Sequence, residues 1–371
     1  MASATTSLPE SSPAGGERVP TGRRAAIVGT GLIGASIGMA LRSRGWHVTG
    51  TDRRLERAQQ ALAAGALDAM GVDPEAEVTF VATPVSAVAS EAGLALAHGG
   101  LVTDVGSVKA PIVEAVDHPC FVGGHPMAGS EQEGVEGAEA GLFQGATWVL
   151  TPTAGTDPAA YARVRSVVST LGADVVALTP ERHDSLVALV SHVPHLTAAT
   201  LMCLAAEGAE EHAALLRLAA GGFRDMTRIA AGHPGIWPDI CAENRDAIVA
   251  ALDRLRSSLD GVRELVSTGD RNGLLHWLEG ARSARANLPG GLARPETLVD
   301  VRVPVPDRPG VVAEVTTLAG ELAVNIEDLE IVHSAEGDRG VLVLVVDAEV
   351  AEVLREALVA RDFRPSVHPL V

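Results

Sequence analysis

A glycine-rich turn near the N-terminus constrains the fold of this chain more than any other feature. Residues 24–28 (RAAIV) predict a short apolar strand, and an amphipathic stretch over residues 35–43 predicts a helix. Between them lies a GxGxxG motif formed by Gly29, Thr30, Gly31, Leu32, Ile33 and Gly34. This order of strand, glycine turn and helix places helix N–H groups against a pyrophosphate, so the turn is a candidate dinucleotide site.

An acidic residue at the end of the next predicted strand supports this interpretation. The apolar run over residues 47–51 ends in Asp52, 18 residues after Gly34. A carboxylate there accepts hydrogen bonds from ribose hydroxyls and repels a 2′-phosphate, so the sequence favours NAD over NADP. Arg53 and Arg54 leave some use of NADP open, because arginines at this place can accommodate that phosphate.

Further apolar runs alternate with helical segments up to residue 180. Strands are expected over residues 77–82, 100–103, 120–122, 146–150 and 174–178. The alternation predicts a Rossmann-type parallel sheet in a dinucleotide-binding domain over residues 23–180. Ligands bind beyond the carboxyl ends of such strands, where Thr83, Ser107 and His125 are expected to gather.

His125 is the strongest candidate for a catalytic group. It lies in the segment GGHPMAGSEQEG (123–134), after the predicted end of a buried strand. An imidazole titrates near neutral pH and can accept a proton from a substrate hydroxyl. Ser107 could hydrogen-bond and orient that imidazole. The alternatives are a hydrogen-bonded loop histidine at 125 and a helix N-cap at Ser107.

From residue 181 to about residue 288, strand alternation gives way to a 3.6-residue apolar period, which predicts an all-helical domain. Its most apolar run, residues 185–206, contains His192, Pro194 and His195, which favours a buried helix over a membrane span. The two histidines would share a helix face. No third ligand has metal-type spacing, so no metal is expected.

Two arginines in this domain, Arg224 and Arg228, lie four residues apart. In a chain of formal net charge −18, they are candidates for binding a substrate carboxylate. The alternative is a structural ion-pair network with Glu131, Asp184 or Asp225. Trp237 is expected either to line the pocket or to fill the core.

Composition excludes other classes of function. The acidic charge argues against a nucleic-acid or anionic-membrane partner. Three widely spaced cysteines suggest a reducing compartment, so a cytoplasmic protein is expected. Residues 1–22 lack the apolar core of a signal peptide and read as a disordered tail.

The C-terminal part predicts a separate small domain. A Gly/Pro-rich linker over residues 289–296 precedes a βαββαβ pattern over residues 297–371, which is ferredoxin-like.

The ordered motifs resemble the prephenate/arogenate dehydrogenases of tyrosine biosynthesis. The resemblance covers about residues 24–290, and its segments are GTGLIG (29–34), TDVGSVK (103–109), GGHPMAGSEQEGVE (123–136), ATWVLTP (146–152), PERHD (180–184), SHVPHL (191–196), FRDMTRIA (223–230) and Trp237. It implies NAD-dependent oxidative decarboxylation of prephenate to 4-hydroxyphenylpyruvate by a homodimer. The amino analogue arogenate, which would yield tyrosine, stays open as the substrate.

The resemblance also implies roles for individual residues. His125 corresponds to the catalytic histidine and Ser107 to its hydrogen-bond partner. The residues implied in substrate binding are His195, Arg228, Ser130 and Trp237, with Ser130 standing where many members have threonine. An ionic network that gates the pocket is implied for Glu131, His183, Asp184 and Arg224.

The C-terminal domain resembles an ACT domain through its DRPG turn (307–310) and the strand that starts at Asn325-Ile326. This implies a tyrosine sensor that lowers activity, with a purely structural module as the alternative. A non-catalytic NAD-binding amino-acid sensor is a competing class of protein. A 3-hydroxyacid dehydrogenase is disfavoured, because enzymes of that type generally rely on a catalytic lysine in the helical domain and residues 181–288 contain no lysine.

Overall fold

A computed structural model describes residues 22–129, 132, 134–211, 214–286, 298–306, 308–333 and 339–369. The chain divides into two compact units, residues 1–257 and residues 258–371. The tail expected over residues 1–22 and the linker expected over residues 289–296 fall outside the described residues, except for Gly22.

The first unit contains an eight-stranded sheet in the order β3-β2-β1-β4-β5-β6-β7-β8. Its strands are β1 (Arg24–Val28), β2 (His47–Thr51), β3 (Ala69–Met70), β4 (Val78–Val81), β5 (Leu101–Asp104), β6 (Phe121–Pro126), β7 (Thr147–Thr151) and β8 (Asp174–Ala177). The strands from β3 to β6 are parallel to one another, which confirms the expected Rossmann-type sheet. The last two strands reverse direction, because β7 pairs with β6 in the antiparallel sense and β8 is parallel to β7.

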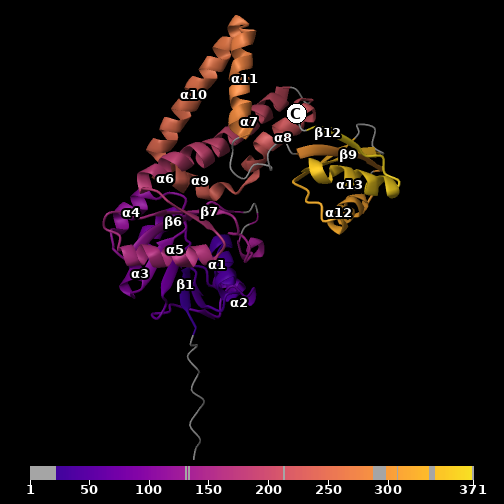
Figure 1. The fold of residues 1–371 in the computed structure, drawn as a ribbon. Coiled ribbons are helices and arrows are strands. Elements are labelled where there is room, and N and C mark those ends of the chain that lie inside the picture. The colour runs from indigo at the N-terminus through magenta and orange to yellow at the C-terminus, as the bar shows by residue number, and fades with distance from the viewer. Residues whose placement is uncertain are drawn as a thin grey trace, which may run out of the picture. The chain divides into compact units, whose positions relative to one another are not determined.

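Helices pack around this sheet (Figure 1). They are α1 (Leu32–Arg42), α2 (Leu55–Ala63), α3 (Val85–Ala97), α4 (Ala110–Val116) and α5 (Pro158–Thr170), and a short 3₁₀ turn, η1, covers Gly134–Gly137. The sheet and helices enclose a core that includes Phe80, Phe143 and Trp148. Burial of these apolar side chains is the main force that holds the sheet and helices together.

Strand β6 is longer than the sequence predicted. The expected strand ended at Val122, but β6 continues through His125 to Pro126. Gly123 and Gly124 pair with Thr151 and Leu150 of β7, so the antiparallel neighbour extends the strand. His125 is therefore held on a strand rather than on a free loop.

The helical segment begins with α6 (Pro180–Val187), followed by one π-helical turn, η2 (Ala188–His192), and by α7 (Val193–Glu211). Pro194 has no N–H to donate, and the wider turn immediately before α7 accommodates it. By length and composition alone, Pro180–Ala209 could cross a membrane, and 28% of its most apolar window is buried. Core helices of soluble proteins pass the same test.

The rest of the helical segment consists of short elements and two long helices. They are η3 (Leu215–Leu218), α8 (Gly221–Thr227), η4 (Arg228–Ala231), η5 (Pro234–Ile236), α9 (Trp237–Glu243), α10 (Arg245–Thr268) and α11 (Arg271–Ala286). The unit boundary falls within α10.

A four-stranded antiparallel sheet forms the C-terminal part, in the order β10-β11-β9-β12. Its elements are β9 (Leu298–Pro306), α12 (Val311–Glu321), β10 (Asp328–His333), β11 (Arg339–Asp347), α13 (Ala348–Ala360) and β12 (Ser366–Pro369). Alternate residues of β9 and β11, such as Val301, Val303 and Leu344, form a core with the two helices. The predicted ferredoxin-like order is confirmed.

Candidate active site

The glycine-rich turn borders a cavity of about 610 Å³ at the carboxyl edge of the sheet. Gly29, Gly31, Asp52, Arg53 and Thr83 are among the residues that line it. These are five of the eight residues predicted to hold the dinucleotide, and the other three, Leu32, Ile33 and Gly34, lie in the first turn of α1.

Glycine is present at each of the three positions of this turn for a different physical reason. Gly29 has a φ of +95°, and a Cβ there would overlap the carbonyl oxygen of Ala82. A Cβ on Gly34 would overlap the carbonyl oxygen of Gly29, whereas one on Gly31 would meet nothing within 4 Å. Gly29 and Gly34 therefore make the tight turn possible, and Gly31 leaves open space in front of the helix.

The residues around this cavity fit a dinucleotide. Gly31 is the N-cap of α1 and offers no side chain to the first helix amides, which leaves them available for a phosphate. The buried hydroxyl of Thr83 has no hydrogen-bond partner among the described residues. Asp52 accepts hydrogen bonds from the backbone N–H of Thr30 at 2.9 Å and of Arg54 at 2.8 Å, which holds its carboxylate at the rim of the cavity.

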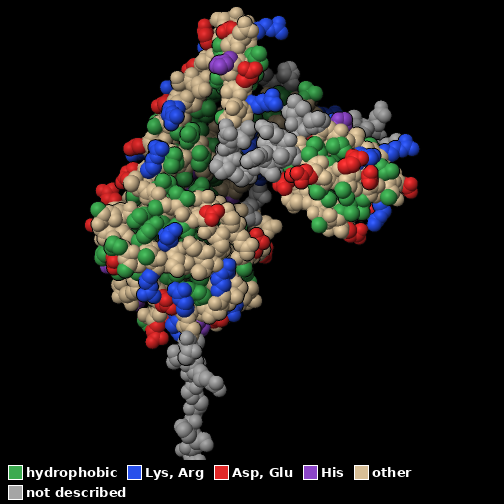
Figure 2. All heavy atoms as spheres, in the orientation of Figure 1, with side chains coloured by type: hydrophobic (Ala, Val, Ile, Leu, Met, Phe, Trp, Pro, Cys, Tyr) green, Lys and Arg blue, Asp and Glu red, His purple; other side chains and the backbone are tan. Residues whose placement is uncertain are grey.

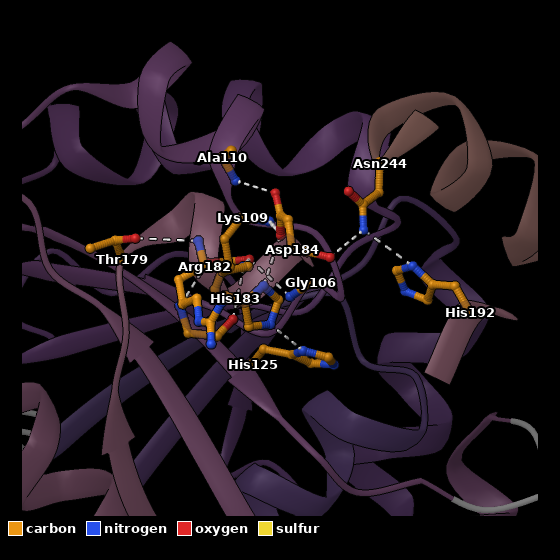
Figure 3. A network of polar contacts seen from close by, with 12 residues as sticks. Gly106, Lys109, Ala110, His125, Thr179, Arg182, His183, Asp184, His192 and Asn244 are labelled. Atoms are coloured by element: carbon orange, nitrogen blue, oxygen red, sulfur yellow. Dashed lines mark hydrogen bonds and ion pairs between the residues drawn. The ribbon is translucent and has the colours of Figure 1, made fainter. Parts of the chain in front are cut away.

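A chain of hydrogen bonds lies behind His125 (Figure 3). Nδ1 of His125 lies 2.8 Å from Nε2 of His183, and Nδ1 of His183 lies 2.8 Å from Oδ1 of Asp184. His183 is fully buried, and His125 is partly buried. The first turns of α6 thus provide two side chains in line with the imidazole of β6.

Asp184 is fixed by backbone groups of another helix. Its Oδ1 accepts a hydrogen bond from the N–H of Lys109 at 2.7 Å, and its Oδ2 accepts one from the N–H of Ala110 at 2.8 Å. These N–H groups lie at the start of α4, whose own N-cap residue makes no side-chain cap. The carboxylate therefore caps α4 and is favoured there as an anion.

This arrangement determines which nitrogens carry protons. A carboxylate that accepts two N–H bonds also accepts the third, so Nδ1 of His183 is the donor to Asp184. In a neutral His183, Nε2 is then an acceptor, and Nδ1 of His125 donates to it. Nε2 of His125 is left with the lone pair of a base.

A buried ion pair holds the backbone beside His125. The Lys109 ammonium and the Asp104 carboxylate are fully buried and form a direct pair. Lys109 Nζ donates to the carbonyl oxygen of Gly124 at 2.8 Å, and Asp104 Oδ1 accepts from the N–H of Gly124 at 3.0 Å. Pairing of β5 with β6 ends at Thr103 and Val122, so this ion pair holds β6 beyond that point.

The surroundings keep the His125 imidazole neutral. Burial lowers the pKa of His125 well below its ordinary value, and the nearby Lys109 ammonium adds to the effect. Burial also lowers the pKa of His192 to about 4 and lowers the pKa of His195. An imidazole with a lowered pKa is unprotonated at neutral pH and is ready to accept a proton.

The two histidines of the SHVPH motif have different partners. Nδ2 of Asn244 donates to the carbonyl oxygen of Asp184 at 2.9 Å and lies 3.2 Å from Nδ1 of the buried His192. The ring of His195 stacks on Trp237, with centroids 3.7 Å apart and planes inclined by 14°. Trp237 also contacts the His192 ring edge-on at 6.1 Å. Hence His192 supports the structure around Asp184, whereas Trp237 orients His195.

A second cavity, of about 680 Å³, is lined by residues of the segment after His125 and by residues close to Arg228 in the sequence. Gly129 and Gln132 line it together with Ile229 of η4 and with Gly232, which follows η4. Gly232 lies close to the His195 ring. Arg228 itself is exposed.

The structure corrects the interactions expected of Ser107. The predicted hydrogen bond from Ser107 to His125 is absent among the described residues, because Nδ1 of His125 is paired with His183. Ser107 does not cap α4 either, since Asp184 satisfies the amides at its start. Arg224 is exposed and forms no ion pair with a described residue, while His183 and Asp184 belong to the chain behind His125. Ser130 and Glu131 lie outside the described residues.

Sequence reasoning missed Lys109, Asp104 and Asn244. The first two belong to the segment TDVGSVK, whose acidic and basic residues within an apolar context were the available signal for a buried pair. Asn244 carried no such signal, because its partners come from α6 and η2 far away in the sequence.

The Rossmann-type sheet, the dinucleotide cavity at its carboxyl edge and the helical segment beside it define an NAD-dependent oxidoreductase. Two family models match the chain: "Prephenate dehydrogenase, nucleotide-binding domain" over residues 37–177, and "Prephenate dehydrogenase, dimerization domain" over residues 179–280. The chain belongs to the prephenate dehydrogenase family.

Individual relatives agree with this assignment. The prephenate dehydrogenase of Bacillus subtilis (strain 168) is 35% identical over 340 residues, which cover 85% of this chain and 90% of the relative. A crystal structure of prephenate dehydrogenase from A. aeolicus in complex with hydroxyphenyl propionate and NAD+ is 30% identical, with a TM-score of 0.67, and covers 72% of this chain and 99% of its own. The arogenate dehydrogenase of Synechocystis is 33% identical, with a TM-score of 0.63, and covers 71% of this chain and 98% of its own.

Proposed function

We propose that this protein catalyses the NAD-dependent oxidative decarboxylation of prephenate to 4-hydroxyphenylpyruvate. The observation that carries the proposal is the chain Asp184–His183–His125, which leaves Nε2 of His125 as a neutral base at the carboxyl edge of the sheet. The dinucleotide cavity lies at the same edge, along the ends of β1, β2 and β4.

In this mechanism His125 accepts the proton of the ring hydroxyl of prephenate. NAD+, when bound, accepts the hydride from the carbon that carries this hydroxyl. The C–C bond to the ring carboxylate then breaks, its electron pair enters the ring, and CO₂ leaves as the ring becomes aromatic. His183 and Asp184 keep the His125 proton on Nδ1 and so preserve the lone pair on Nε2. General-base assistance of this kind is worth about 10²–10⁴-fold in rate.

The remaining predicted residues are assigned to substrate binding. His195 and Arg228 bind the substrate's carboxylate or carbonyl groups, and Trp237 orients His195 by stacking on it. Ser130, which follows His125 closely in the sequence, is proposed to offer its hydroxyl group to the substrate. Ser107, which follows β5 at the same edge of the sheet, is proposed to offer a second hydroxyl group. Glu131 and Arg224 remain proposed members of a gate at the entrance.

Replacing His125 by asparagine tests the base. We expect His125→Asn to lower turnover at least about 100-fold, on the basis of the usual contribution of a general base. The circular dichroism spectrum and the melting temperature should stay close to those of the unchanged enzyme. Near-normal turnover in the purified variant would refute the role of His125.

Arogenate is the alternative substrate, favoured by the similarity to the Synechocystis arogenate dehydrogenase. Steady-state rates with prephenate and with arogenate under identical conditions separate the two. Tight NAD binding without turnover of either substrate would instead indicate a non-catalytic sensor.

A homodimer is proposed because apolar side chains are exposed along the long helices. Val249, Leu259 and Val266 of α10 and Leu275 and Leu278 of α11 are each at least half exposed. Figure 2 shows hydrophobic side chains gathered along α10. The matched dimerization-domain model covers this segment up to residue 280, and a second copy would bury these side chains. Sedimentation equilibrium measures the mass directly.

Three domains are proposed: a dinucleotide-binding domain over residues 23–180, a helical domain over residues 181–288 and an ACT-like domain over residues 297–371. The C-terminal sheet belongs to the ACT-like domain. Its βαββαβ order and the left-handed Gly310 before α12 support that assignment. Tyrosine is the proposed effector. Titrating tyrosine against the full chain and against a chain truncated after Gly290 tests it, and equal inhibition of both would remove the sensing role.

A cytoplasmic location completes the proposal. Cys120, Cys203 and Cys241 are unpaired, as expected of a protein in a reducing compartment.

A further inference from the structure

One side chain of the helical segment reaches the dinucleotide cavity. Asp239, the third residue of α9, lines the cavity of about 610 Å³. The other described residues that line this cavity all lie between Val28 and Glu91, in the sheet domain. Asp239 therefore joins the wall of this cavity from a part of the chain that follows the predicted substrate-binding segment.

Asp239 is held by a residue of the sheet domain. The Ser86 hydroxyl donates to Oδ2 of Asp239 at 2.7 Å, across the boundary between α3 and α9. Among the described residues no cation pairs with Asp239, and its Oδ1 has no partner. The carboxylate is only partly exposed, so it is desolvated in part while it keeps the capacity to accept further hydrogen bonds.

The strand order places Asp239 along the path of a dinucleotide. Asp52 follows β2, Gly29 follows β1 and Thr83 follows β4, and these strands are adjacent in the order β2-β1-β4. A dinucleotide with its adenosine ribose at Asp52 and its pyrophosphate at the glycine turn extends next toward the end of β4. Ser86 and Asp239 lie there, on the side of the nicotinamide half.

We propose that Asp239 binds the hydroxyl groups of the ribose in the nicotinamide half of NAD, with Ser86 holding its carboxylate in place. A carboxylate is the usual acceptor for a ribose diol, and Asp52 fills the same role at the other end. The same helix carries Trp237, which stacks on His195, so this contact also links the cofactor to a wall of the predicted substrate site. The proposal rests on the proposed use of NAD.

A purely structural contact predicts a different outcome. The ligand is an anion because of its pyrophosphate, so removing a nearby negative charge should strengthen binding or leave it unchanged. If Asp239 binds the ribose, its loss should weaken the binding of ligands that contain the second ribose. The binding of ligands without that ribose should not weaken.

Isothermal titration calorimetry with ADP, ADP-ribose and NAD+ distinguishes these cases in the full-length protein. For Asp239→Ala we expect the Kd of ADP-ribose and of NAD+ to rise about tenfold or more, as for the loss of hydrogen bonds to a charged group. The Kd of ADP should stay within about twofold of its original value by the same reasoning. Ser86→Ala should show the same pattern with a smaller change. Glu91→Ala, which removes another carboxylate of the same cavity, is the matched control and should not weaken the binding of any of the three ligands.

Unchanged or tighter binding of ADP-ribose by Asp239→Ala would overturn the inference. An equal loss for ADP would do the same, because ADP lacks the second ribose. If the alanine variant does not fold, Asp239→Asn, which keeps the size of the side chain, provides the comparison. Failure of the unchanged protein to bind either ADP or NAD+ would refute the proposed function itself.

Discussion

Replacing His183 by leucine tests whether the hydrogen-bond chain behind His125 controls the protonation of the proposed base. In the structure, Nδ1 of His125 has Nε2 of the buried His183 as its partner at 2.8 Å. Leucine removes this acceptor and retains an apolar side chain of moderate size. The Nδ1–H of His125 would then point at a group that cannot accept a hydrogen bond.

The size of the effect follows from that lost acceptor. A buried N–H without a partner costs about 1–3 kcal/mol, and His125 avoids this cost by moving its proton to Nε2. The tautomer that can accept a proton at Nε2 would become rarer by the same free energy, which corresponds to about 5- to 150-fold. We therefore expect kcat to fall by that factor, with little change in the Kd of NAD+.

Steady-state kinetics and calorimetry with NAD+ provide the measurement, and His183→Gln provides the control. The glutamine amide can donate to Asp184 and its oxygen can accept from His125, so part of the lost kcat should return. If His183→Leu retained its full kcat, or if glutamine and leucine gave identical losses, the protonation argument would be wrong.

Three further predictions follow from single contacts. Arg228→Ala should raise the KM for prephenate more than it changes kcat, as expected for a residue that binds a substrate carboxylate, and a loss confined to kcat would contradict that role. His192 has a folded pKa of about 4, so the unfolded chain binds its proton first on acidification, and the free energy of unfolding should fall by about 2 kcal/mol between pH 7 and pH 5. Urea titrations should show this pH dependence reduced in His192→Gln. Gly124→Ala would place a Cβ 2.7 Å from the backbone oxygen of Asp104 and should lower the free energy of unfolding by about 1–3 kcal/mol, whereas Gly93→Ala, with nothing within 4 Å, should not destabilise the fold.

Local sequence patterns were sufficient to predict that the glycine turn and Asp52 lie together at one cavity. The strand, the glycine turn and Asp52 form a contiguous unit in which each residue acts through its own backbone or its own position at a strand end. A Cβ at Gly34 would overlap Gly29 of the same turn, and a Cβ at Gly29 would overlap Ala82, which directly follows the adjacent strand β4.

The catalytic side depended on contacts that no local pattern encodes. The sequence marked His125, Ser107, His183 and Asp184 as functional, but it paired His125 with Ser107 and did not predict the contact between His125 and His183. The reason is that α6 follows an antiparallel excursion through β7 and β8, and the register of that return decides which side chain faces β6. A shift of one residue along α6 would have brought a different side chain to His125.

The linear sequence by itself determined the alternation of strands and helices, the place of the glycine turn, the helical middle and the βαββαβ order at the C-terminus, because each depends on periodicity and on residues close together in the chain. Only the tertiary structure decided that Asp184 caps a helix 74 residues away, that Lys109 and Asp104 enclose Gly124, and that Asp239 reaches the dinucleotide cavity. These contacts depend on packing between distant elements, where burial makes each unpaired polar group costly and so selects one arrangement.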